Sequence, residues 1–94
     1  NNNPPAVTGY RLTGNYPNPF NPATMIRYSL PAESFVSIKV YNITGKEIAT
    51  LVNGVQTAGE YQITFDGKNL ASGVYLLRMS AGEFSSTIKM NLLK

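Results

Sequence analysis

Residues 15–22 read Asn15-Tyr16-Pro17-Asn18-Pro19-Phe20-Asn21-Pro22, a proline-rich stretch with two aromatic rings that precedes a strand-patterned sequence. Its three prolines lack backbone donors, so the stretch is excluded from a helix and from a central strand. The asparagines beside them favour turns. We interpret the stretch either as an ordered loop that plugs one end of the fold or as a recognition surface. In both cases we expect Tyr16 or Phe20 to be partly buried, because aromatic rings bury large apolar areas.

Outward from this loop, apolar and polar residues alternate with a period of two, and a helical period is almost absent. The alternation is clear in residues 26–30, 36–41, 60–65 and 84–92. This pattern is typical of antiparallel strands that place one face in the core and the other in water. The chain is therefore expected to be built from strands.

Turn signals separate the alternating segments at intervals of about ten residues. They occur at residues 42–45, whose glycine can supply a positive φ, at 66–69, where an aspartate can cap its own backbone, and at 80–83. Asn-Gly and Ala-Gly pairs predict a longer loop within residues 53–59. With further strands at 46–52 and 74–79 and a short strand near residues 10–12, the count reaches seven. The sequence thus predicts an all-β protein, an immunoglobulin-like antiparallel β-sandwich of about seven strands.

One segment departs from the alternation, because five of the six residues from Val74 to Met79 are apolar. Burial of both faces is typical of a central strand, whose outer face the loop at 15–22 or neighbouring aromatic rings would cover. The alternative is that Tyr75, Leu77 and Met79 form an exposed docking patch.

Length and composition describe a single domain of 94 residues with 43% hydrophobic residues and no cysteine, so packing alone must stabilise it. Residues 1–9 begin Asn-Asn-Asn-Pro-Pro and are expected to be a linker, which leaves 10–94 as the domain. Residues 1–9 do not show the pattern of a signal peptide, and we expect the sequence to be part of a longer protein.

The net charge of +3 comes from dispersed basic residues without a run of adjacent lysines or arginines. This distribution predicts a solvated surface and no nucleic-acid partner. No apolar run approaches the length of a membrane span, so no membrane-spanning segment is expected.

The sequence offers few groups for chemistry, because it contains neither histidine nor cysteine. The commonest general base and the usual zinc ligands are therefore missing. Its five acidic residues lie on separate turns or strands, and the glycines show no nucleotide-binding spacing. We expect no catalytic, metal or cofactor site, and no enzymatic activity. Carbohydrate binding would require a row of exposed aromatic rings.

Several motifs in order resemble a known family. The loop at 15–22 is followed by Val-Tyr-Asn-Ile-Thr-Gly at 40–45, Asp-Gly at 66–67, Ser-Gly-Val-Tyr at 72–75 and a final Lys89-Met90. Together they resemble the type A C-terminal sorting domain of proteins exported by the type IX secretion system, over about residues 15–94. The immunoglobulin-like domain of flagellar hook-capping proteins is related and shares several of the motifs.

The resemblance implies a non-catalytic sorting signal that directs an upstream cargo to the cell surface or medium of a Gram-negative bacterium, via the periplasm. The partners implied are the outer-membrane translocon and a sortase-like peptidase of the type IX system. The recognition residues implied are Asn15, Tyr16, Pro17, Asn18, Pro19, Phe20, Gly73, Val74, Tyr75 and Lys89. The alternative is an immunoglobulin-like structural or carbohydrate-binding accessory module of a larger secreted protein.

Overall fold

The alternating segments of the sequence form β-strands, and the computed structural model describes residues 9–94. The strands are β1 (Arg11–Tyr16), β2 (Ala23–Leu30), β3 (Ser34–Asn42), β4 (Glu47–Gln56), β5 (Gly59–Asp66), β6 (Gly73–Ala81) and β7 (Phe84–Leu92). Residues 1–8, and with them nearly all of the predicted linker, lie outside the described residues.

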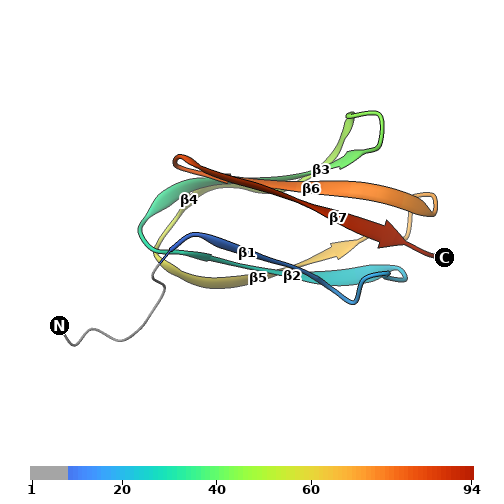
Figure 1. The fold of residues 1–94 in the computed structure, drawn as a ribbon, viewed down its shortest axis with the longest axis horizontal. Coiled ribbons are helices and arrows are strands. Elements are labelled where there is room, and N and C mark those ends of the chain that lie inside the picture. Colours follow the sequence, from blue (N-terminus) through green and yellow to red (C-terminus); the bar gives the residue numbers. More distant parts are fainter. Residues whose placement is uncertain (1–8) are drawn as a thin grey trace.

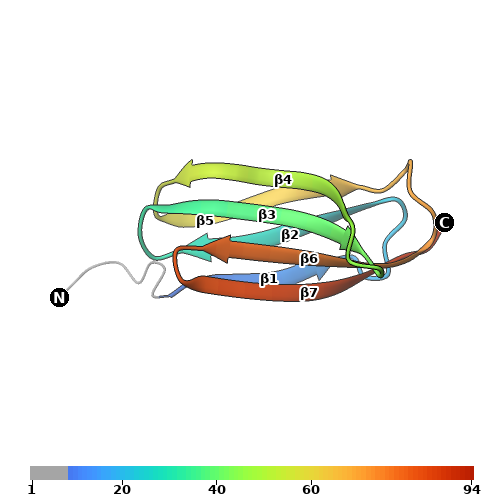
Figure 2. The ribbon, with the colours of Figure 1, turned by 90° about the horizontal axis from the view of Figure 1, so that it is seen from above.

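The strands form two layers, which Figures 1 and 2 show from the side and from above. One sheet has the order β1-β2-β5 and the other β4-β3-β6-β7, with every pair antiparallel. The chain crosses between the layers after β2, after β4 and after β5. The predicted all-β sandwich of seven strands is confirmed, and the relation to immunoglobulin-like domains stays a prediction.

The core lies between the layers and follows the predicted alternation. Ile26, Tyr28 and Leu30 face inward from β2, and Val36, Ile38 and Val40 face them from β3. Strands β6 and β7 add the buried side chains of Tyr75, Leu77, Met79, Ala81, Met90 and Leu92. Burial of these apolar side chains is the main favourable contribution to folding, since no disulfide is present.

Strand β6 is an interior strand, as the apolar segment at 74–79 suggested, because it pairs with β3 on one side and β7 on the other. Tyr75, Leu77 and Met79 are buried in the core. The alternative of an exposed docking patch made by these three residues is therefore wrong. Val74 and Leu76 lie half-buried on the outer face.

Two boundaries differ from the sequence-based expectation. The Asn53-Gly54 pair does not open a loop but continues β4, where Asn53 pairs with Ser37 and Gly54 with Val36. The ladder with the long strand β3 outweighs the local turn preference of an Asn-Gly pair. Likewise β1 reaches Tyr16, so the first two residues of the predicted loop belong to a strand.

Candidate functional site

The proline-rich segment after β1 lies along the edge of β7, about 70 residues later in the chain. The amide of Phe20 donates to the carbonyl of Asn91 (2.9 Å), and the amide of Leu93 donates to the carbonyl of Phe20 (2.9 Å). Phe20 and Leu92 thereby form a short parallel bridge. The segment acts as a brief additional strand at one end of the four-stranded sheet.

Asn18 reinforces this contact with both polar atoms of its side chain. Its Oδ1 accepts a hydrogen bond from the amide of Asn91 (2.9 Å), and its Nδ2 donates to the carbonyl of Lys89 (3.2 Å). The amide group thus takes the place of a backbone partner for β7. The start of the segment is held as well, because the Thr24 hydroxyl donates to the carbonyl of Pro17 (2.8 Å).

Phe20 anchors the segment in the core, where its side chain is 1% exposed. Its ring packs edge-on against Phe65, with centroids 6.0 Å apart. The ring of Tyr16 lies on the surface, 81% exposed. The prediction that one of the two rings is buried is confirmed at Phe20, and the segment plugs the end of the sandwich there.

The turn after β5 packs against the same end of the sandwich. The amide of Gly67 donates to the carbonyl of Pro22 (2.8 Å). A Cβ at Gly67 would lie 3.0 Å from Cδ2 of Leu92 and 3.4 Å from Cε2 of Phe20. Only glycine fits this contact without displacing a core side chain. The carboxylate of Asp66 accepts from the amide of Lys68 (2.9 Å), as the turn pattern predicted.

The remaining sequence-predicted residues join this end through the pairing of β6 with β7. Gly73 lies opposite Leu92, and Val74 opposite Asn91. Lys89 is exposed and lies opposite Leu76, on the outer face of the sheet. Three segments that are far apart in the sequence therefore meet at one end of the molecule, which we call the loop–β7 surface: residues 17–20, 73–76 and 89–91.

The sequence-predicted recognition residues divide into two groups by exposure. Tyr16, Pro17, Asn18, Pro19, Gly73 and Lys89 are exposed, while Asn15 and Val74 are half-buried. Phe20 and Tyr75 are buried, and the Tyr75 hydroxyl donates to the carbonyl of Ala71 (2.6 Å). Within the folded domain these two side chains position the surface and do not reach a partner.

A shallow groove of about 370 Å³ lies on the outer side of the three-stranded sheet. Asn15 and Tyr16 line it together with Met25 and Arg27 of β2 and with a β-bulge at Thr13 and Gly14. Sequence reasoning missed Met25 and Arg27 as surface neighbours of Tyr16. The period-two pattern placed both on the face opposite Ile26, but only the strand register brings Met25 beside Tyr16.

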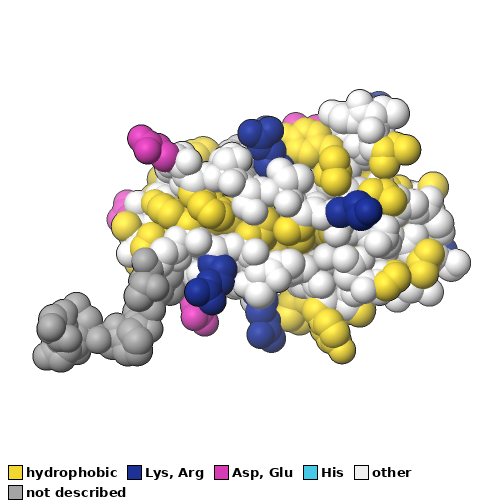
Figure 3. Space-filling model, viewed as in Figure 1, with side chains coloured by type: hydrophobic (Ala, Val, Ile, Leu, Met, Phe, Trp, Pro, Cys, Tyr) yellow, Lys and Arg dark blue, Asp and Glu magenta, His cyan; other side chains and the backbone are white. Residues whose placement is uncertain are grey.

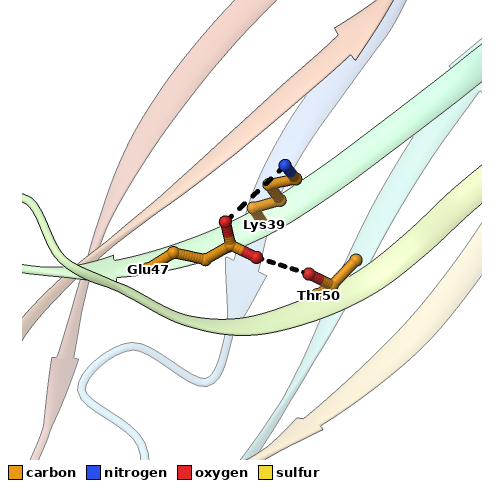
Figure 4. A network of polar contacts seen from close by, with 3 residues as sticks. All are labelled: Lys39, Glu47 and Thr50. Carbon is orange, nitrogen blue, oxygen red and sulfur yellow. Dashed lines mark hydrogen bonds and ion pairs between the residues drawn. The ribbon is translucent and has the colours of Figure 1, made fainter.

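The acidic residues serve structural roles where the structure shows their contacts. Glu47 accepts a hydrogen bond from the Thr50 hydroxyl (2.6 Å) and lies 3.6 Å from Nζ of Lys39 (Figure 4). The hydrogen bond from Thr50, and then the charge of Lys39, lower the pKa of the Glu47 carboxyl. Within residues 9–94, no group of three or more acidic, histidine or cysteine side chains is arranged to hold a metal ion.

Exposed aromatic rings do not form a row on the described surface. Tyr16 belongs to the three-stranded sheet, whereas Phe35, 56% exposed, lies on β3 of the other sheet. The described rings at positions 28, 65 and 75 are buried. No observation on this surface favours stacking of a sugar chain. Residues 9–94 also contain no helix that is long and apolar enough to span a membrane.

A family model described as a secretion system C-terminal sorting domain matches residues 15–92. No curated protein matches the chain. The family match runs from the end of β1 to the end of β7, and it includes all three segments of the loop–β7 surface.

Proposed function

Because the chain belongs to the family of secretion system C-terminal sorting domains, we propose that the outer-membrane translocon of the type IX secretion system binds its loop–β7 surface. Domains of this family are sorting signals that direct an attached cargo through the type IX system to the cell surface or medium. We propose further that a sortase-like peptidase acts on the domain after transport, that the host is a Gram-negative bacterium, and that the domain comprises residues 10–94.

One observation supports this surface above others. Residues 17–20, 73–76 and 89–91 converge at one end through hydrogen bonds and strand register. A signal read on a folded domain must be read as shape, because the backbone groups of its strands are mostly paired. A surface formed by three distant segments exists only when the sandwich has folded, and it therefore reports folding to its receptor.

We further propose that the domain has no enzymatic activity. The family is one of sorting signals, and the sequence contains no histidine and no cysteine. Its acidic residues are single surface groups, of which Glu47 accepts from a hydroxyl of its own strand and Asp66 from a backbone amide of its own turn.

An export assay tests the proposed surface. Residues 1–94 are fused behind a signal-peptide-bearing reporter and expressed in a Gram-negative bacterium with a working type IX system. We expect the reporter at the cell surface or in the medium, and in the periplasm of a strain without the translocon. Lys89→Ala should reduce export, while its folding cost should stay within about 0.5 kcal/mol because the side chain is exposed.

The matched control is Lys46→Ala. Lys46 is an exposed lysine next to β4, and two strands, β3 and β6, separate β4 from β7. This control should export normally. Equal export of both variants at unchanged melting temperature would show that Lys89 is a solvated edge charge and that the translocon contact lies elsewhere.

A further inference from the structure

Strands β1 and β7 are edge strands of different sheets that lie on the same side of the sandwich (Figure 1). The two edges are not hydrogen-bonded to each other. Edge strands present unpaired backbone groups, and proteins usually protect them with prolines, bulges or covering segments. Strand β1 has a bulge and is followed by prolines, whereas β7 pairs with β6 without a register shift.

The hydrogen bonds of β7 show which of its backbone groups point away from β6. Asn91 uses both its amide and its carbonyl toward the loop, on the side away from β6. Backbone groups of alternate residues in a strand point the same way, so those of Ser85, Thr87 and Lys89 also point away from β6. The carbonyl of Lys89 accepts from Asn18. Within the described chain, the backbone hydrogen bonds outside the sheets involve neither Ser85 nor Thr87.

Beside this free edge lies an apolar seam between the two layers. Tyr10 stacks on Phe84 at one end of the seam, with ring centroids 5.4 Å apart. Phe20 closes the other end, where it bridges to Leu92. Between these ends Leu12 and Ile88 are only half-buried. Figure 3 shows a band of hydrophobic side chains running between β7 and β1 on this side of the molecule.

Basic side chains flank the seam on both sides (Figure 3). Lys89 and Arg78 are exposed on the four-stranded sheet, and Arg11 and Arg27 on the three-stranded one. Their positive charges favour an occupant that carries acidic side chains next to its apolar ones.

We propose that the β7 edge at residues 85–89 binds an extended polypeptide segment as an added strand. The segment has apolar side chains at alternate positions, which cover Leu12 and Ile88, and acidic side chains at the positions between them. Main-chain hydrogen bonds to Ser85, to Thr87 and to the amide of Lys89 hold it, as in other strand-addition complexes. The added strand continues the pairing that the loop at 17–20 already makes with the next part of β7. The isolated folded domain is sufficient to bind the segment, so this binding can be measured without export.

The test uses the full 94-residue chain and the synthetic peptide Glu-Val-Glu-Val-Glu-Val-Glu, which reads the same in both directions and so presupposes no strand direction. We expect the peptide to shift the NMR amide signals of Ser85, Thr87 and Lys89 most strongly. Thr87→Pro removes one outward amide and should weaken binding at least tenfold, while Thr87→Ala keeps that amide and should bind like the unchanged chain. Absence of binding, or shifts centred on β4 or β5, would overturn the proposal.

Methylated peptides keep the test decisive if Thr87→Pro does not fold. In an added strand only alternate peptide amides face β7. Methylating the backbone amides of the valines or those of the glutamates should therefore abolish binding in one case and leave it intact in the other. Equal effects of both would contradict strand addition. Shifts of the same amides with protein concentration alone would mean that a second copy fills the edge, and would also contradict the proposal.

Discussion

At the scale of single residues, Phe20 connects the proline-rich segment to the core. Its ring is 1% exposed and packs against Phe65. Its amide donates to the carbonyl of Asn91, and its carbonyl accepts from the amide of Leu93. We expect Phe20→Ala to lower the free energy of unfolding by about 3–5 kcal/mol, because it removes a buried ring and leaves a cavity. Urea unfolding followed by circular dichroism measures this. Tyr16→Ala is the control and should cost less than about 0.5 kcal/mol, since that ring is exposed; similar losses for both would contradict the anchoring role.

Tyr28 makes the stability of the domain depend on pH in the alkaline range. Burial raises the pKa of its phenol above the ordinary value of 10.0, and the phenol donates a hydrogen bond to Oε1 of Gln56 (2.6 Å). The folded state therefore holds the phenol proton more tightly than the unfolded state does. This contribution to stability is complete below about pH 10 and is lost as the pH rises through the folded pKa.

The corresponding measurement is the melting temperature of the unchanged chain and of Tyr28→Phe between pH 8 and 11. The variant should be less stable by about 1 kcal/mol at pH 8, because the hydrogen bond to Gln56 is lost. Its stability should fall less steeply above pH 10. Parallel curves for the two proteins would assign the alkaline loss to other groups.

At the scale of elements, period-two alternation predicted β2, β3, β5 and β7, because one face of each meets the core, while the mostly apolar run at 74–79 predicted the interior strand β6. Local sequence patterns gave wrong predictions where the pairing between strands determined the structure. Asn53-Gly54 is a strong turn signal, yet β4 continues through it because β3 offers a full ladder of partners. The proline-rich segment could be predicted as ordered. Its attachment to β7 could not, because the bridge joins Phe20 to Leu92 across most of the chain.

The two glycines at 54 and 67 test this difference between local preference and packing. Gly67→Ala places a Cβ 3.0 Å from Leu92 in the core and should destabilise the domain by about 1–3 kcal/mol. Gly54→Ala meets no atom within 4 Å and should raise the free energy of unfolding by about 0.5 kcal/mol, since glycine weakens a strand interior. Denaturant midpoints measure both. Equal effects would mean that the turn at Gly67 moves freely relative to the loop.

At the scale of the whole molecule, the sequence contained the parts of the candidate surface but not their arrangement. Asn18, Val74 and Lys89 were predicted as separate motif residues, and strand order and register bring them to one end. Met25 and Arg27 escaped prediction because they adjoin Tyr16 only through the pairing of β1 with β2. The open seam beside β7 likewise depends on which two strands become neighbouring edges, and composition carries no information about that choice.

Removal of residues 84–94 tests whether the domain must fold to act as a sorting signal. The deletion takes away β7, and with it the buried side chains of Met90 and Leu92 and the backbone partners of Phe20. A domain of this size is stable by only about 5–15 kcal/mol, so the truncated chain should show no cooperative thermal transition. Its cargo should then remain in the periplasm. A truncated chain that is still exported would place the sorting signal upstream of β7, in a segment read without the folded sandwich.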